Sequence, residues 1–245
     1  MNLSARTYWE ESRSHRYSLL FALPLLLLYE LLEAVAPVRM RGGVVRNGAD
    51  VLLTSVFTAL LGPRGPMVFM ALVIGFALIL IWRDRPPGGW PLRLSNFPFM
   101  LLESGALALV FGFVVGTATV RLLGPLHSLA AGAGGLGGTP LERLTLSLGA
   151  GLYEELLFRV VLVALFSNAM RLIGFSRVTS GVVAVIAGAL VFSAFHYVGP
   201  LGEPLRLDSF VFRALAGVAF SALYLTRGFG ITAWTHALYD VAVLM

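Results

Sequence analysis

Long apolar stretches recur along this chain, separated by short polar turns. One extends from Tyr17 to Ala36 and another over residues 98–123, and each is long enough to cross the hydrocarbon core of a bilayer as a helix. Hydrophobic residues make up 58% of the 245 residues and charged residues 13%, and the mean hydropathy is +0.84. A soluble protein could not cover so much apolar surface. We therefore predict an all-α fold, a polytopic membrane bundle of about eight transmembrane helices.

The predicted spans are bounded by turn and capping signals. Asp50 is the expected N-cap of a short second helix, and Thr139, Pro140 and Glu142 predict a capping box at the start of the fifth. The spans are expected at residues 17–36, 51–61, 67–82, 98–123, 141–170, 179–198, 209–226 and 231–245. Ala34-Val35-Ala36 resembles a signal-peptidase site, but the run before it is long and contains Glu30 and Glu33. We expect it to stay as the first membrane helix.

A Gly/Ala-rich segment at residues 124–140 divides the chain. No stretch before it combines histidines with carboxylates, whereas several after it do. We therefore treat residues 1–123 as N-terminal membrane helices, residues 124–140 as a linker, and residues 141–245 as a catalytic helical core.

The composition excludes some functions and favours certain partners. The chain has no cysteine, so a disulfide framework, a thiolate zinc site and a cysteine nucleophile are impossible. The net charge of +5 fits a protein surrounded by anionic membrane lipids. No basic block is interleaved with aromatic residues, so we expect no nucleic-acid partner.

The stretch Tyr153–Arg159 places two carboxylates and a guanidinium inside an apolar segment. Each ionised side chain costs roughly 2.5–3.5 kcal/mol at the centre of a membrane helix. On a helix, Glu155 and Arg159 fall one turn apart on the same face and can pair, while Glu154 points about 100° away. One carboxylate is then neutralised and the other is left for another role. The alternative is a buried ion pair with a spare acid that only fixes helix packing.

Two of the four histidines lie in apolar helices. His196 follows Phe192 by four residues, and His236 precedes Asp240 by four, so each pair shares a helix face. A lone membrane histidine is usually a packing residue, but both together with the diacid helix predict a common intramembrane cavity lined by three neighbouring helices. His15 and His127 are expected to be solvated and are assigned no role.

Such a cavity permits hydrolysis. A buried carboxylate can act as a general base on water, and imidazoles can orient that water, bind a metal or stabilise an oxyanion. Asp240 can hold His236 in one tautomer. A Zn²⁺ site is the alternative, with His196, His236, Glu154 and Asp240 as its ligands. The spacing is not that of H-E-x-x-H, so the sequence leaves the use of a metal open and requires no cofactor.

Three motifs occur in order on successive C-terminal helices: Glu-Glu-x-x-x-Arg at 154–159, Phe-x-x-x-His at 192–196 and His-x-x-x-Asp at 236–240. This set resembles the CPBP family of intramembrane proteases, which includes the CAAX prenyl endopeptidases and the bacterial Abi proteins. The resemblance covers residues from about 140 to 245 and implies an all-helical membrane fold with its active site below the membrane surface.

The resemblance also implies a role for each motif residue. Glu154 would be the general base, Glu155 and Arg159 its supporting ion pair, and His196 the group that orients water or binds metal. His236 and Asp240 match the last motif. The prenyl-protease branch has Asn where this chain has Asp240, and an ionised Asp would repel an oxyanion. Asp240 is therefore expected to be a partner of His236 or a metal ligand.

These observations predict an intramembrane endopeptidase that cleaves a membrane-anchored or lipidated protein near its C-terminal tail, in the inner membrane of a bacterium. One alternative is a non-catalytic immunity or scaffold protein of the same fold. Another is a proton-coupled transporter, since intramembrane Glu and His also build relays. Transporters often contain internal repeats, and none is evident in this sequence.

Overall fold

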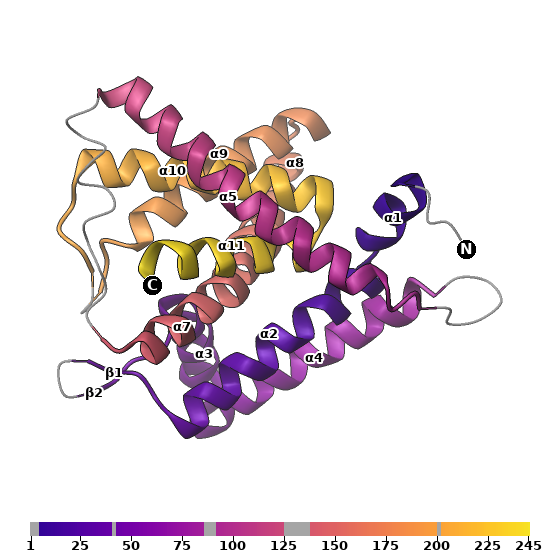
Figure 1. Cartoon of the computed structure of the whole chain (residues 1–245), viewed down its shortest axis with the longest axis horizontal. Helices are drawn as coiled ribbons and strands as arrows, with labels where there is room; N and C mark the ends of the chain where they lie inside the picture. Colours follow the sequence, from indigo (N-terminus) through magenta and orange to yellow (C-terminus); the bar gives the residue numbers. More distant parts are fainter. Residues whose placement is uncertain (1–4, 41–42, 86–91, 125–137, 200–201) are drawn as a thin grey trace.

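We analysed a computed structural model of the chain, which describes residues 5–40, 43–85, 92–124, 138–199 and 202–245. Within this part the fold is helical except for a short antiparallel pairing of β1 (Arg39–Met40) with β2 (Gly43–Val44) (Figure 1). Most of the predicted linker, residues 125–137, lies outside the described residues, and His127 lies there too.

The described helices follow the predicted order, with one additional helix near the N-terminus (Figure 1). Before the linker they are α1 (Ala5–Ser12), α2 (His15–Val35), α3 (Gly48–Leu61), the 3₁₀ turn η1 (Gly62–Arg64), α4 (Gly65–Arg83) and α5 (Asn96–Leu123). After the linker they are α7 (Pro140–Gly149), the π-helical segments η2 (Ala150–Glu154) and η3 (Leu156–Leu162), α8 (Val163–Leu172), α9 (Arg177–Phe195), α10 (Leu207–Arg227) and α11 (Phe229–Leu244).

The prediction of about eight spans is not confirmed, because only five helical stretches among the described residues are long and apolar enough to cross a membrane. Three predicted spans are lost for identifiable reasons. α3 and α4 are joined by η1 alone and together form one apolar stretch, Gly48–Arg83, although the chain turns sharply at η1 and the two helices pack on each other. The predicted helix 141–170 is interrupted by π-helical segments. α11 has only 16 residues. The remaining stretches are His15–Val35, Asn96–Leu123, Arg177–Phe195 and Leu207–Arg227.

The capping predictions have mixed outcomes. The capping box of Thr139 and Glu142 is present at the start of α7. Asp50 is wrong as an N-cap, because α3 begins earlier and Asn47 caps it with its side-chain oxygen, which accepts from the backbone N–H groups of Ala49 and Asp50. The carboxylate of Asp50 instead accepts from Tyr29.

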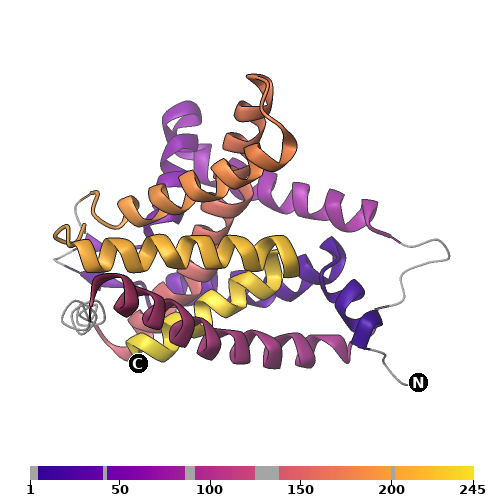
Figure 2. The ribbon, with the colours of Figure 1, turned by 90° about the horizontal axis from the view of Figure 1, so that it is seen from above.

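The last helix, α11, lies in the middle of the bundle, where it packs on α5, α2, α7, η2 and α10 (Figure 1). α10 in turn packs on α9 and α5 (Figure 2). Small residues allow the closest approaches: a Cβ added at Gly151 would lie 2.4 Å from the carbonyl oxygen of Ala233, and one at Gly217 would lie 2.8 Å from Cα of Ala189. Such contacts are typical of helices that pack in lipid, where close van der Waals fit replaces the hydrophobic effect.

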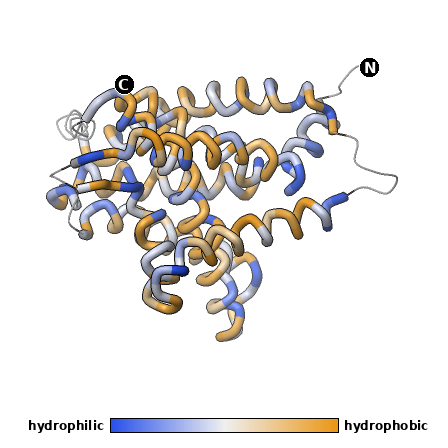
Figure 3. Tube along the Cα trace, turned by 90° about the horizontal axis from the view of Figure 1, so that it is seen from below, coloured by the Kyte–Doolittle hydropathy of each residue, from blue (hydrophilic) through white to orange (hydrophobic). Residues whose placement is uncertain are grey.

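Hydrophobic residues occupy much of the length of the helices (Figure 3). On α5, the side chains of Leu102, Leu109 and Phe113 are more than 70% exposed. Contiguous apolar surface of this kind is unfavourable in water and normal in a bilayer. The chain is an integral membrane protein.

Candidate active site

The diacid motif lies in a helix with local π geometry, since η2 ends at Glu154 and η3 begins at Leu156. π-Helical turns are uncommon and occur often at functional sites. The relative exposure of Glu154, Glu155 and Arg159 is 7%, 0% and 2%. Charges buried to this degree need partners within the protein.

Glu155 is held between two cationic or donating groups. Its Oε2 lies 3.2 Å from Nε of Arg159, which is the ion pair predicted from the i, i+4 spacing. Its Oε1 lies 2.7 Å from Nδ1 of His236, on α11. Because an ionised carboxylate only accepts, the Nδ1–H of His236 donates. Glu155 therefore links α11 to the motif helix, by which we mean the continuous helical segment Pro140–Leu172 formed by α7, η2, η3 and α8.

The guanidinium of Arg159 is enclosed by aromatic rings. It lies 4.5 Å from the ring centroid of Phe192 and 5.4 Å from that of Phe220. None of its nitrogens makes a hydrogen bond of good geometry within the described part of the chain. Its charge is therefore stabilised by the nearby carboxylate and by the faces of the two rings.

Glu154 has a different environment. Its Oε1 accepts a hydrogen bond from Nδ2 of Asn47 at 2.9 Å, and its charge interacts with both His196 and His236. Sequence reasoning missed Asn47. The available signal was the pair Asn47-Gly48 just before an apolar run, because Asn is among the best N-cap residues. The contact with Glu154 itself spans 107 residues of sequence, and no local pattern predicts it.

His196 lies at the C-cap of α9, at the end of the apolar helix where it was predicted. Its Nδ1 is 2.9 Å from the carbonyl oxygen of Phe192. A carbonyl can only accept, so Nδ1 carries a hydrogen, and in the neutral ring Nε2 keeps its lone pair.

His236 is buried in α11, with its ring stacked on Phe220 at 4.4 Å between centroids. Its Nε2 lies 3.7 Å from Oδ2 of Asp240, which is within range of a charge interaction but longer than a hydrogen bond. Carboxylates thus flank both ring nitrogens, Glu155 on one side and Asp240 on the other.

Sequence reasoning also missed Arg213 on α10. Its guanidinium donates to Glu203 at 2.7 Å and to the hydroxyl of Tyr197 at 3.1 Å. Its charge acts on both His196 and Asp240. Arg213 therefore acts on two motif residues, His196 and Asp240, from a helix that carries none of the three motifs.

The donor set does not fit a zinc ion. Among the described residues, no group of three or more His, Cys, Asp or Glu side chains is placed to hold a metal. Both ring nitrogens of His236 already face carboxylates.

The expected intramembrane cavity is not confirmed. The rings of Phe192 and Phe220 pack on the guanidinium of Arg159, and the ring of Phe220 also stacks on His236. A pocket lies instead at Asn168, Arg171 and Leu172, near the end of α8.

Residues 137–242 match the family model described as type II CAAX prenyl endopeptidase, Rce1-like. This match confirms the family resemblance carried by the three motifs. All six candidate site residues lie inside the matched range, whereas Asn47 lies outside it. A search among curated proteins found no match, and neither did a search among solved structures. The match indicates an intramembrane protease of the CAAX type, a hydrolase.

Proposed function

We propose that this protein is an intramembrane endopeptidase that hydrolyses a peptide bond near the C-terminal tail of a membrane-anchored or lipidated protein. The observation that carries the proposal is that the two adjacent carboxylates have different hydrogen-bond and ion-pair partners. Glu155 is engaged by Arg159 and His236, while Glu154 has only the neutral Asn47 as a hydrogen-bond donor in the described part of the chain. A buried carboxylate without a bound cation is suited to accept a proton from water.

The reaction begins when Glu154 takes a proton from a water molecule. The hydroxide adds to the carbonyl carbon of the scissile bond and forms a tetrahedral oxyanion. Collapse of this intermediate breaks the C–N bond, and the proton passes from Glu154 to the leaving amine. His196 supports this step, because the lone pair on its Nε2 can accept a hydrogen bond from the same water and orient it.

The other motif residues stabilise the charges of the reaction, on the tetrahedral oxyanion and on Glu154. His236 lies between the carboxylates of Glu155 and Asp240, and in its imidazolium form it places a positive charge near the oxyanion and stabilises it. Asp240 keeps the ring oriented, as carboxylate partners of catalytic histidines do. Arg159 neutralises Glu155, so that its charge does not oppose the ionisation of Glu154.

The family match and the apolar helices support the proposed class of substrate. A peptide whose C-terminal region carries a lipid would be held at the bilayer, where the apolar helices of this protein also lie. We place the protein in a bacterial inner membrane, with membrane lipids and a lipidated protein as its partners and without nucleic acid.

The test compares the C-termini of membrane proteins from cells that contain the wild-type protein, Glu154→Gln or His196→Ala. We expect a set of shortened C-termini that is present with the wild type and lost with both variants, since general-base groups contribute about 10²–10⁴-fold to rate. His15→Ala is the matched control, because His15 is exposed and lies outside the site.

Three results would contradict the proposed peptidase mechanism. If Glu154→Gln leaves the C-termini as in the wild type, the hydrolytic mechanism is wrong. Full biological activity of Glu154→Ala would instead favour the non-catalytic immunity or scaffold protein, and proton-dependent uptake in proteoliposomes would favour the transporter.

A further inference from the structure

We propose that Asn47 is a positioning residue for Glu154, and that the N-terminal region, outside the family match, thereby forms part of the active site. The proposal rests on the function proposed above, in which Glu154 is the base. Asn47 lies between α2 and α3, well before the matched range of residues 137–242.

The orientation of the Asn47 amide is determined by its neighbours. Its Oδ1 accepts from the backbone N–H of Ala49 at 2.9 Å and from that of Asp50 at 3.4 Å, because Asn47 is the N-cap of α3. An N-cap side chain must present an acceptor to these groups. Nδ2 is therefore directed away from α3, and it donates to Oε1 of Glu154 at 2.9 Å.

This hydrogen bond restricts a side chain that would otherwise rotate. The terminal torsion of glutamate is broad and has no strong rotamer preference. With Oε1 held by Asn47, Oε2 keeps its lone pairs for a water molecule. Asn is neutral, so it fixes the carboxylate without supplying the positive charge that would weaken a base.

A polar network holds Asn47 in turn. Its backbone N–H donates to the hydroxyl of Tyr29 at 3.3 Å, and this hydroxyl donates to Asp50 at 2.8 Å. Arg46 bridges Asp50 and Glu30. The hydroxyl of Tyr153, the residue before Glu154, donates to the same Glu30 at 2.7 Å. The network therefore returns to the motif helix next to the base.

Two glycines provide the space for this arrangement. A Cβ added at Gly149, on the motif helix, would lie 2.5 Å from Cε2 of Tyr29 and 2.9 Å from Cβ of Asn47. A Cβ at Gly48 would lie 3.1 Å from Cε1 of Phe195, the residue before His196. The start of α3 is thus packed between the helices that carry the base and the first imidazole.

The experiment separates the two roles of Asn47. Asn47→Ser keeps an N-cap oxygen but removes the donor to Glu154, and Asn47→Asp keeps the shape but replaces the donor with an acceptor. The full-length protein in liposomes is assayed with an internally quenched, farnesylated CAAX peptide. We expect kcat to fall about 10- to 100-fold in both variants, with KM within about twofold of wild type, as for a misplaced catalytic group. Asn47→Ser should melt within a few degrees of the wild type.

Asn96→Ser is the matched control. Asn96 is also buried and also donates to a carboxylate, that of Glu11, but this contact joins the start of α5 to α1 and includes none of the candidate site residues. This variant should keep the wild-type kcat even if it melts earlier. Wild-type kcat in Asn47→Ser would overturn the positioning role while leaving the proposed function intact, and so would a change in KM alone. A wild-type protein that neither cleaves this peptide nor shortens any C-terminus in the comparison of membrane proteins would overturn the proposed function and, with it, this inference.

Discussion

At the scale of single residues, the most unusual environment is that of Arg159. The guanidinium is almost completely buried, lies against Phe192 and Phe220, and forms its ion pair with Glu155. Removing one partner of a buried pair is costly because the other charge is left without compensation.

We predict that Arg159→Met lowers stability by about 3–5 kcal/mol. The double variant Arg159→Met/Glu155→Gln should recover part of this loss, because a glutamine side chain carries no charge and can still accept from His236. Thermal unfolding in detergent measures the stability of the single and the double variant. The single variant Glu155→Gln is measured too, so that the three variants and the wild type form a double-mutant cycle. A double variant that is less stable than Arg159→Met would show that the ion pair does not control stability here.

At the scale of elements, the site depends on how closely α11 approaches η2. Gly151 makes this approach possible, since an added Cβ would lie 2.4 Å from the Ala233 oxygen and 2.7 Å from Cβ of Ala237. Ala237 adjoins His236, and Gly151 lies one turn before Glu155. The contact between Gly151 and α11 therefore sets the distance between η2 and His236.

Gly151→Ala should force α11 outward and lengthen the contact between His236 and Glu155. We expect a loss of about 1–3 kcal/mol in stability from overpacking and a loss of most peptidase activity, measured by unfolding and by C-terminal processing. Gly75→Ala is the control, because a Cβ there meets nothing within 4 Å. Equal behaviour of the two variants would show that the approach of α11 is not limiting.

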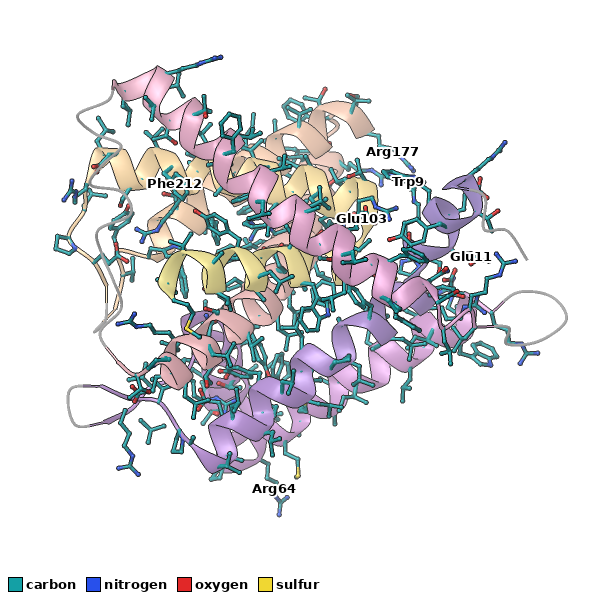
Figure 4. All side chains as sticks on the ribbon, viewed as in Figure 1. Trp9, Glu11, Arg64, Glu103, Arg177 and Phe212 are labelled. Carbon is teal, nitrogen blue, oxygen red and sulfur yellow. The ribbon has the colours of Figure 1, made fainter. Side chains whose placement is uncertain are left out.

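At the scale of the whole molecule, a second buried arginine joins the two ends of the chain. Arg227, at the end of α10, pairs with Glu103 of α5 at 2.6 Å and donates to the hydroxyl of Ser12 at 2.8 Å. Its guanidinium also lies 3.9 Å from the ring centroid of Trp9 in α1. Figure 4 shows Trp9 and Glu103 at this junction. The N-terminal helix α1 is thus attached to α5 and α10.

Replacing Arg227 with Met should loosen α1 and lower stability by about 3–5 kcal/mol, since Glu103 loses its cationic partner and keeps the hydrogen bond from Tyr8 of α1. Limited proteolysis should then cut within residues 5–12 faster than in the wild type. Arg64→Met, at the exposed corner between α3 and α4 (Figure 4), should change neither quantity. Unchanged proteolysis of Arg227→Met would mean that other contacts hold α1.

The sequence alone determined the class of the protein and the identity of its chemical groups. Apolar runs with capping signals predict helices, because helix formation depends on neighbouring residues. The i, i+4 spacing predicted the pair of Glu155 and Arg159. The charges of the motif were conspicuous because charged side chains are costly in an apolar segment.

Only the tertiary structure decided which groups meet. Asn47 reaches Glu154 across 107 residues, and His236 reaches Glu155 across 81. Arg213, on α10, acts through its charge on His196 and Asp240, which lie on two other elements. The number of spanning stretches also depended on the corner at η1 and on the π geometry around the motif. Such contacts follow from the packing of helices distant in sequence, which local periodicity does not encode.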